Sequence, residues 1–202
     1  MAVAKINLAV LISGSGSNLQ ALIDACAKPD YPAKINVVIS NRPNAYGLKR
    51  AEKAGIPAEI VDHTKYANRI DFESVLQNVL GKYPVDLICL AGFMRILTPE
   101  FVARWQGRII NTHPALLPKH GGKGMFGEHV HKSVLAAGDA ESGVSIHYVI
   151  PEVDRGEIIL QRRVKVEPGD TYETLAARVL AEEHIAYEEA VRMIAEKKQK
   201  QA

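Results

Sequence analysis

Short apolar runs alternate with amphipathic segments along the first half of this 202-residue chain. Strands are expected at the β-branched runs, over residues 6–13, 35–40, 58–62, 85–92 and 108–114. Helices are expected between them, over residues 18–27, 46–54, 70–82 and 99–105. Strands separated by helices are typical of a mostly parallel sheet with helices on both faces. The alternation therefore predicts an α/β protein.

The pattern changes after Pro114. A glycine-rich stretch leads to a predicted helix over residues 130–137, and two further apolar runs follow at residues 143–150 and 156–168. Only "PEVDR" joins these two runs, so we expect an antiparallel strand region toward the C-terminus. A last helix is expected after "GDTYETL", with Thr171 as its N-cap. No repeat or linker interrupts the chain, so the sequence predicts a single domain over residues 1–202.

Composition limits the kinds of partner. The net charge of +2 is too small to attract nucleic acid or a membrane surface by bulk electrostatics. No apolar stretch approaches the length of a membrane span, and the N-terminus lacks the features of a signal peptide. Cys26 and Cys89 lie in apolar stretches outside any Cys-x-x-Cys pair, which is typical of free thiols in a reducing compartment. We expect a cytoplasmic monomer or homodimer that binds small molecules.

A glycine-rich loop, Gly14 to Asn18, joins the first run to the first helical segment. Leu19 stands where a dinucleotide-binding fingerprint has its third glycine, and the Gly-Lys-Ser/Thr of a P-loop is absent. Two interpretations remain. The loop holds a single phosphate through backbone N–H groups and the side chains of Ser17 and Asn18. Alternatively, it is a tight turn whose glycines serve backbone geometry alone.

Asn111 and His113 end the fifth run in the sequence "NTHP". Two residues apart on an extended chain, they project to the same side. An asparagine amide can donate to an oxyanion, and an imidazolium can stabilise that charge and transfer a proton. Asp154 lies in the later connection, where a carboxylate near His113 would raise the pKa of its imidazole. The simpler interpretations are a polar strand end and an ordinary turn aspartate.

Ligands of open parallel sheets bind beyond the carboxyl ends of the strands, near the point where the strand order reverses. The polar groups after the first, fourth and fifth runs are therefore expected at one edge. The histidines of the glycine-rich stretch, His120, His129 and His131, do not complete a metal-ligand pattern, because "EHVH" places the last two at i, i+2. We predict no metal site there, and interpret the stretch as a mobile loop on the substrate side.

Five motifs, in this order and spacing, resemble the phosphoribosylglycinamide formyltransferases, the monofunctional folate-dependent family of purine synthesis. They are "SGSGSNLQALIDA", "LAGFMRIL", "INTHPALLPK", "GVSIHYV" and "VDRGEIILQ". The resemblance extends from Ile6 to about Met193 and implies a single-domain, Rossmann-like formyltransferase fold. It implies transfer of a formyl group from 10-formyltetrahydrofolate, as co-substrate, to the amine of glycinamide ribonucleotide. Residues 1–110 would bind the ribonucleotide phosphate, and residues 111–202 would form the catalytic and folate-side region.

The resemblance also implies roles for single residues. In catalysis, Asn111 and protonated His113 would hold the oxyanion, and Asp154 would keep His113 charged. Ribonucleotide binding would fall to Gly16, Ser17, Asn18 and Glu183. Folate binding would fall to Arg69, Met94, Arg95, Ile96, Leu97, Asn111 and Asp154, with residues 150–154 closing on the pterin. His147 matches a family histidine near the site. Residues 119–127 form a longer loop than in many relatives and receive no role.

Three other activities are weighed against this one. A methionyl-tRNA formyltransferase would need a further RNA-binding domain and a basic surface. A 10-formyltetrahydrofolate hydrolase is expected to carry an extra N-terminal domain and has no need of the phosphate loop. A non-catalytic nucleotide-binding module would leave Asn111, His113 and Asp154 without a purpose.

Overall fold

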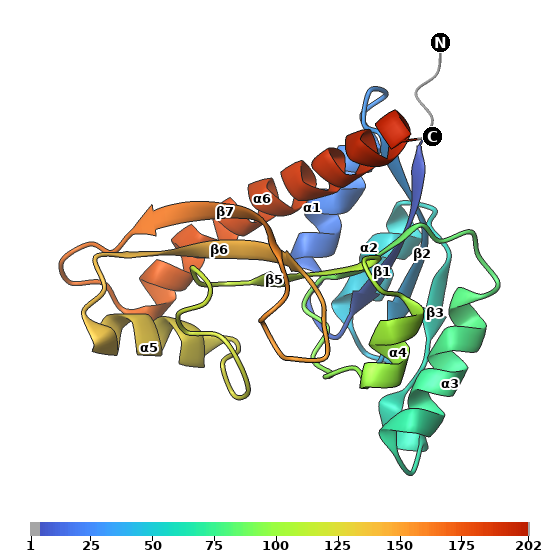
Figure 1. The fold of residues 1–202 in the computed structure, drawn as a ribbon, viewed down its shortest axis with the longest axis horizontal. Helices are drawn as coiled ribbons and strands as arrows, with labels where there is room; N and C mark the ends of the chain where they lie inside the picture. Colours follow the sequence, from blue (N-terminus) through green and yellow to red (C-terminus); the bar gives the residue numbers. More distant parts are fainter. Residues whose placement is uncertain (1–4, 202) are drawn as a thin grey trace.

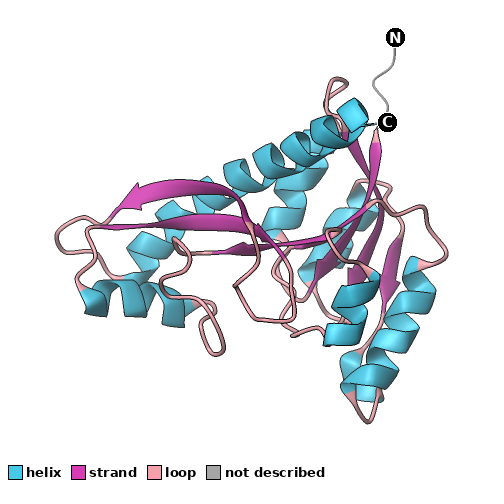
Figure 2. Cartoon of the chain, viewed as in Figure 1, coloured by secondary structure: helices cyan, strands magenta, loops and turns pink. Residues whose placement is uncertain are grey.

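A computed structural model describes residues 5–201, whose strands form one seven-stranded sheet (Figures 1 and 2). The strands are β1 (Ile6–Ile12), β2 (Ala33–Ser40), β3 (Ala58–Ile60), β4 (Leu87–Leu90), β5 (Ile109–His113), β6 (Glu141–Tyr148) and β7 (Ile158–Lys165). Their order is β3-β2-β1-β4-β5-β6-β7. The first five run parallel, and β6 and β7 are antiparallel to their neighbours. The predicted fold class is confirmed.

Helices cover both faces of the sheet (Figure 1). They are α1 (Ser17–Cys26), α2 (Tyr46–Lys53), α3 (Arg69–Leu80), α4 (Pro99–Arg104), α5 (Glu128–Ala137) and α6 (Tyr172–Gln201). Leu8 and Val10 of β1 pack into the core beneath α1 and α6, whereas Ala9 and Leu11 pack into the core beneath α3 and α4. Because both faces of β1 are buried, its sequence is apolar throughout and does not alternate.

The predicted element boundaries hold to within a few residues. The final helix begins after Thr171, as predicted, and Thr171 Oγ1 accepts from the Thr174 N–H at 3.3 Å. The hydroxyl of Thr174 in turn accepts from the Thr171 N–H at 3.0 Å, so threonine takes the place that glutamate has in a capping box. A short 3-10 turn, η1 (His63–Lys65), was not predicted, and Asp62 caps it through the Thr64 N–H at 3.0 Å.

The strand order reverses between β1 and β4. The chain runs outward from β1 through β2 to β3, then returns to β4 on the other side of β1. Ser13 joins the strand ends at this point. Its Oγ accepts from the Met94 N–H at 2.7 Å and donates to Asn41 Oδ1 at 2.6 Å. The loops after β1, β2 and β4 therefore meet at one edge, where such folds bind ligands.

Both cysteines are free thiols, as expected. Burial raises the pKa of the Cys26 thiol to about 12 and also raises that of Cys89. Within residues 5–201, none of the helices has the length and apolar character needed to cross a membrane.

Candidate active site

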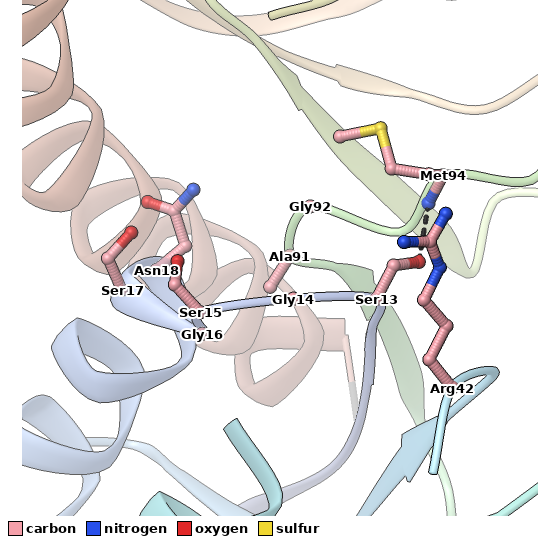
Figure 3. A pocket seen from close by; sticks show the side chains of 10 residues that line it. All are labelled: Ser13, Gly14, Ser15, Gly16, Ser17, Asn18, Arg42, Ala91, Gly92 and Met94. Atoms are coloured by element: carbon pink, nitrogen blue, oxygen red, sulfur yellow. Dashed lines mark hydrogen bonds between the residues drawn. The ribbon is translucent and has the colours of Figure 1, made fainter. Parts of the chain in front are cut away.

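The β1–α1 loop lines a pocket of about 250 Å³ at the point where the strand order reverses (Figure 3). Its walls also include Arg42 after β2 and the residues Ala91, Gly92 and Met94 after β4. Gly16 has a left-handed φ of 71°, and a Cβ there would lie 2.7 Å from the Cα of Gly47. A glycine is therefore needed at position 16 for both backbone conformation and the close approach of α2.

The electrostatics of this pocket favour an anion. The first hydrogen bond of α1 runs from the Gln20 N–H to the Gly16 carbonyl, so the N–H groups of Ser17 and Asn18 have no helical partner. No acidic residue lies in the first turn of α1, so the positive end of its dipole is not offset locally. The guanidinium of Arg42 reaches the same pocket and makes no hydrogen bond or ion pair with another described residue.

Glu183 connects the pocket to β5. This α6 carboxyl is 8% exposed, and its Oε1 accepts from Asn18 Nδ2 and Thr112 Oγ1, each at 2.8 Å. Burial raises the pKa of Glu183, and the two hydrogen bonds oppose that shift. Asn18 Oδ1 is buried without a partner among the described residues. The amide nitrogen of Asn18 is thus engaged with Glu183, and Oε2 of Glu183 is left to accept from a ligand hydroxyl.

A second group of polar side chains gathers where β5 and β6 meet the β6–β7 connection. Asp154 adopts a left-handed φ of 57° in that connection. Its Oδ2 lies 3.5 Å from His113 Nδ1, and its Oδ1 lies 3.6 Å from His147 Nε2. Asn111 pairs with His147 across the antiparallel ladder, with 3.3 Å between Asn111 Nδ2 and His147 Nε2. The structure therefore brings Asn111, His113 and Asp154 together and adds His147.

Burial decides the net pKa shift of His113. The ring is 4% exposed, and its desolvation lowers the pKa below the ordinary histidine value. Asp154 raises that pKa, as expected from the sequence, but its contribution is smaller than that of burial. The net shift is therefore downward, although Asp154 acts in the predicted direction. The pKa of Asp154 is itself lowered: its hydrogen bonds and the neighbouring histidines together outweigh burial, which acts in the raising direction.

The second glycine-rich segment, residues 119–127, for which no role was predicted, contacts both His113 and Asp154. His113 Nε2 lies 2.8 Å from the backbone carbonyl oxygen of His120. The Gly122 N–H donates to Asp154 Oδ2 at 2.9 Å. Because a carbonyl oxygen only accepts, Nε2 of His113 carries the hydrogen, and Nδ1 faces Asp154.

Four of the predicted folate-side residues, Met94 to Leu97, lie in the loop after β4. Met94 and Ile96 are exposed, whereas Leu97 is buried. Arg95 is half-buried, and its Nε has no partner among the described residues. Arg69 is the exposed first residue of α3, one helical turn before Glu73, which accepts from the Thr98 N–H at 2.8 Å. Because residues four apart share a helix face, Arg69 lies on the side of α3 that meets this loop. Exposed apolar groups beside guanidinium donors suit an aromatic ligand with an anionic end.

The histidines of the glycine-rich stretch have separate surroundings. His120 contacts Asp139 and Ser133, and His129 packs edge-on against Phe126. His131 is buried and its Nδ1 is unpaired. Across residues 5–201, no three histidine, cysteine, aspartate or glutamate side chains form a group that could hold a metal ion.

Two contributors to the site, Arg42 and Thr112, were not predicted from the sequence, and the neighbours of His147 were left open. Arg42 lies two residues after β2, so a basic residue near a strand end was the available signal. Thr112 lies between Asn111 and His113, and strand alternation turns it to the opposite face, toward Glu183. Pairing the runs 108–114 and 143–150 as antiparallel strands would have placed His147 opposite Asn111.

Comparison with known proteins gives one consistent result. Residues 6–191 match the family model described as formyl transferase. The chain is 48% identical over 191 residues to the trifunctional purine biosynthetic protein adenosine-3 of Gallus gallus, covering 95% of this chain and 18% of that protein. It thus spans about a fifth of the length of such multifunctional relatives.

Two single-function proteins match over most of their length. The phosphoribosylglycinamide formyltransferase of Escherichia coli is 43% identical over 181 residues, covering 90% of this chain and 83% of that protein. The solved structure of the phosphoribosylglycinamide formyltransferase of Coxiella burnetii is 48% identical, with a TM-score of 0.89. That match covers 96% of this chain and 88% of the solved one.

Proposed function

This chain belongs to the formyl transferase family, and from that membership we propose that it formylates glycinamide ribonucleotide. The formyl donor is 10-formyltetrahydrofolate, and the products are formylglycinamide ribonucleotide and tetrahydrofolate. The reaction is a step of purine biosynthesis. One observation carries the proposal: an anion pocket lies at the same sheet edge as an Asn–His–Asp group whose His113 and Asp154 side chains are buried.

The ribonucleotide binds along the edge from β1 to β5. Its 5′-phosphate enters the pocket of Gly16, Ser17 and Asn18, where helix N–H groups and the positive end of α1 attract it. Arg42 supplies a cation from the opposite wall. A ribose hydroxyl donates to Oε2 of Glu183, whose Oε1 is already held by Asn18 and Thr112. This binding directs the amine toward β5.

The folate occupies the surface formed by Met94, Arg95, Ile96 and Leu97. Its ring system packs against the exposed apolar side chains, and the connection 150–154 closes on the pterin. The folate tail ends in carboxylates, which suit the guanidinium donors of Arg69 and Arg95. In this arrangement residues 1–110 hold the ribonucleotide phosphate and much of the folate, and residues 111–202 hold the reacting groups and the ribose contact of Glu183.

Catalysis begins when the amine of glycinamide ribonucleotide attacks the formyl carbon. A carbon–nitrogen bond forms, and the carbonyl electron pair moves to oxygen, giving a tetrahedral oxyanion. Asn111 has two amide hydrogens, so it can donate one to the oxyanion while the other contacts His147. Protonated His113 donates from Nδ1. The negative charge of the oxyanion raises the pKa of the imidazole and so favours its charged form.

Collapse of the intermediate completes the transfer. The attacking nitrogen loses a proton, the bond from the formyl carbon to the folate nitrogen breaks, and that nitrogen gains a proton. Asp154 contacts both His113 and His147, which gives it a position to pass this proton through a bound water and to favour the charged imidazole. Asp154 and Asn111 also lie where the formyl end of the folate must sit.

The formyltransferase, the hydrolase and the non-catalytic binding module predict different outcomes when the protein is mixed with a 10-formyl folate. The test incubates the protein with a 10-formyl folate, with and without glycinamide ribonucleotide, and follows deformylation of the folate by absorbance. We expect a signal only with the ribonucleotide. A signal of equal size without it would establish a hydrolase. Binding of both compounds without turnover would instead establish a non-catalytic module.

A further inference from the structure

Residues His120 to Gly122 hold the His113–Asp154 pair from both sides. The His120 carbonyl accepts from His113 Nε2 at 2.8 Å, and the Gly122 N–H donates to Asp154 Oδ2 at 2.9 Å. Between them, a Cβ on Gly121 would overlap the Leu117 side chain and lie 3.3 Å from Cβ of Asp154. The backbone of this segment thus packs directly against the reacting groups.

The contact with the His120 carbonyl selects one tautomer of His113. A neutral imidazole carries its hydrogen on either nitrogen, and the partner of one nitrogen decides which. Since the carbonyl accepts, the hydrogen is on Nε2. The other nitrogen, Nδ1, is then directed toward Asp154 at 3.5 Å and toward the place where the formyl group is attacked.

The backbone at His120 needs support to make this contact. Its φ of 53° lies in the left-handed region, which non-glycine residues adopt only at a cost in conformational energy. The His120 side chain supplies that support. Its Nε2 lies 2.8 Å from Asp139 Oδ2 and its Nδ1 lies 2.8 Å from Ser133 Oγ. The ring is 12% exposed, so water competes little for these bonds.

The anchor lies in and just after α5. Ser133 lies within α5, and Asp139 follows the glycine that ends this helix. The only other side chain bonded to Asp139 in residues 5–201 is Lys119, at 2.9 Å from Oδ1, and that lysine is 70% exposed. Among the described side chains, His120 is thus the one bonded to Oδ2 of Asp139.

We propose that Asp139 and His120 form a positioning pair for His113. Asp139 anchors the His120 ring, the His120 carbonyl keeps hydrogen on Nε2 of His113, and Nδ1 remains the nitrogen that acts on the substrate. The catalytic consequence rests on the proposed function, whereas the effect on the His113 ring does not. Neither Asp139 nor His120 touches the substrate in this proposal.

The test combines turnover with nitrogen NMR of the His113 ring, assigned by comparison with His113→Gln. In Asp139→Ala we expect kcat to fall tenfold to about a hundredfold, because a loosely held reacting group loses its alignment. The KM for the ribonucleotide stays unchanged, since its phosphate pocket lies elsewhere. The ring spectrum at high pH changes from the Nε2–H tautomer to a mixture of tautomers.

Three variants serve as controls. Lys119→Ala removes the other partner of Asp139 and is expected to match the wild type in both measurements. Asp139→Asn keeps an acceptor oxygen and is expected to restore most of the turnover. His120→Gly accepts the left-handed φ and keeps the carbonyl but loses the anchor, so it should show the same defect as Asp139→Ala. The double variant should be no worse than either single one.

A wild-type ring spectrum in Asp139→Ala would overturn the proposal, whether or not turnover falls. A defect in Lys119→Ala as large as that in Asp139→Ala would also overturn it. Unfolding curves show whether Asp139→Ala is folded, and His120→Gly carries the test if it is not. Absence of formyl transfer by the wild type would reject the proposed function while leaving the tautomer measurement decisive.

Discussion

Nδ1 of His113 lies 3.5 Å from Oδ2 of Asp154, and both side chains are more than nine-tenths buried. Burial favours the neutral imidazole, and the carboxylate favours the charged one. The pKa of His113 is consequently lowered. Because both side chains are buried, little water screens the interaction between them. In the proposed mechanism, the negative charge of the oxyanion would act to raise this pKa.

Removal of the imidazole should abolish most of the activity while leaving the fold intact. In His113→Ala we expect kcat to fall about a hundredfold or more, the cost of losing an oxyanion donor. Asp154 keeps the Gly122 N–H and His147 as partners, so the carboxylate is not left unpaired. Steady-state kinetics and denaturant unfolding check both parts. Normal turnover by a folded variant would contradict the assigned mechanism.

Neutralising Asp154 should lower the pKa of His113 further. The carboxylate raises that pKa against burial, so Asp154→Asn leaves burial with less opposition. A pH titration of the ring protons by NMR measures the change. An unchanged or raised His113 pKa would show that the two groups do not interact as inferred.

Arg42 should contribute to binding of the ribonucleotide phosphate. We expect Arg42→Ala to raise the KM for glycinamide ribonucleotide about tenfold, the effect of one charge-assisted hydrogen bond, and to leave kcat nearly unchanged. Lys53→Ala makes the same charge change at the exposed end of α2, outside the pocket, and should have little effect. Equal effects of the two variants would mean that only the overall charge matters. The KM difference should shrink at high salt.

Gly16 should be irreplaceable, and Gly14 should not. A Cβ at position 16 would meet Gly47 at 2.7 Å with φ at 71°, whereas a Cβ at position 14 meets nothing within 4 Å. Gly16→Ala should therefore lower the free energy of unfolding by about 1–3 kcal/mol, and Gly14→Ala by less than about 1 kcal/mol. Urea unfolding of both variants provides the comparison. Similar stabilities would show that α2 can shift away from the loop.

The sequence by itself determined the α/β class, the approximate bounds of the strands and helices, and the sheet edge at which the polar loops gather. These features depend on local periodicity and on glycine placement, which neighbouring residues encode. The same reasoning selected Asn111, His113 and Asp154 as candidate reacting groups, because their side-chain chemistry limits what they can do.

Only the tertiary structure decided which groups are neighbours and how far apart they lie. It turned Thr112 and Asn18 toward Glu183, set His147 beside Asn111, and brought Arg42 to the pocket. It also set the net direction of the His113 pKa shift, because burial by distant segments outweighs one carboxylate. The anchoring of the loop by Asp139 is a further example. Desolvation, the selection of a tautomer and the distances between remote side chains all depend on packing, and no short stretch of sequence encodes packing.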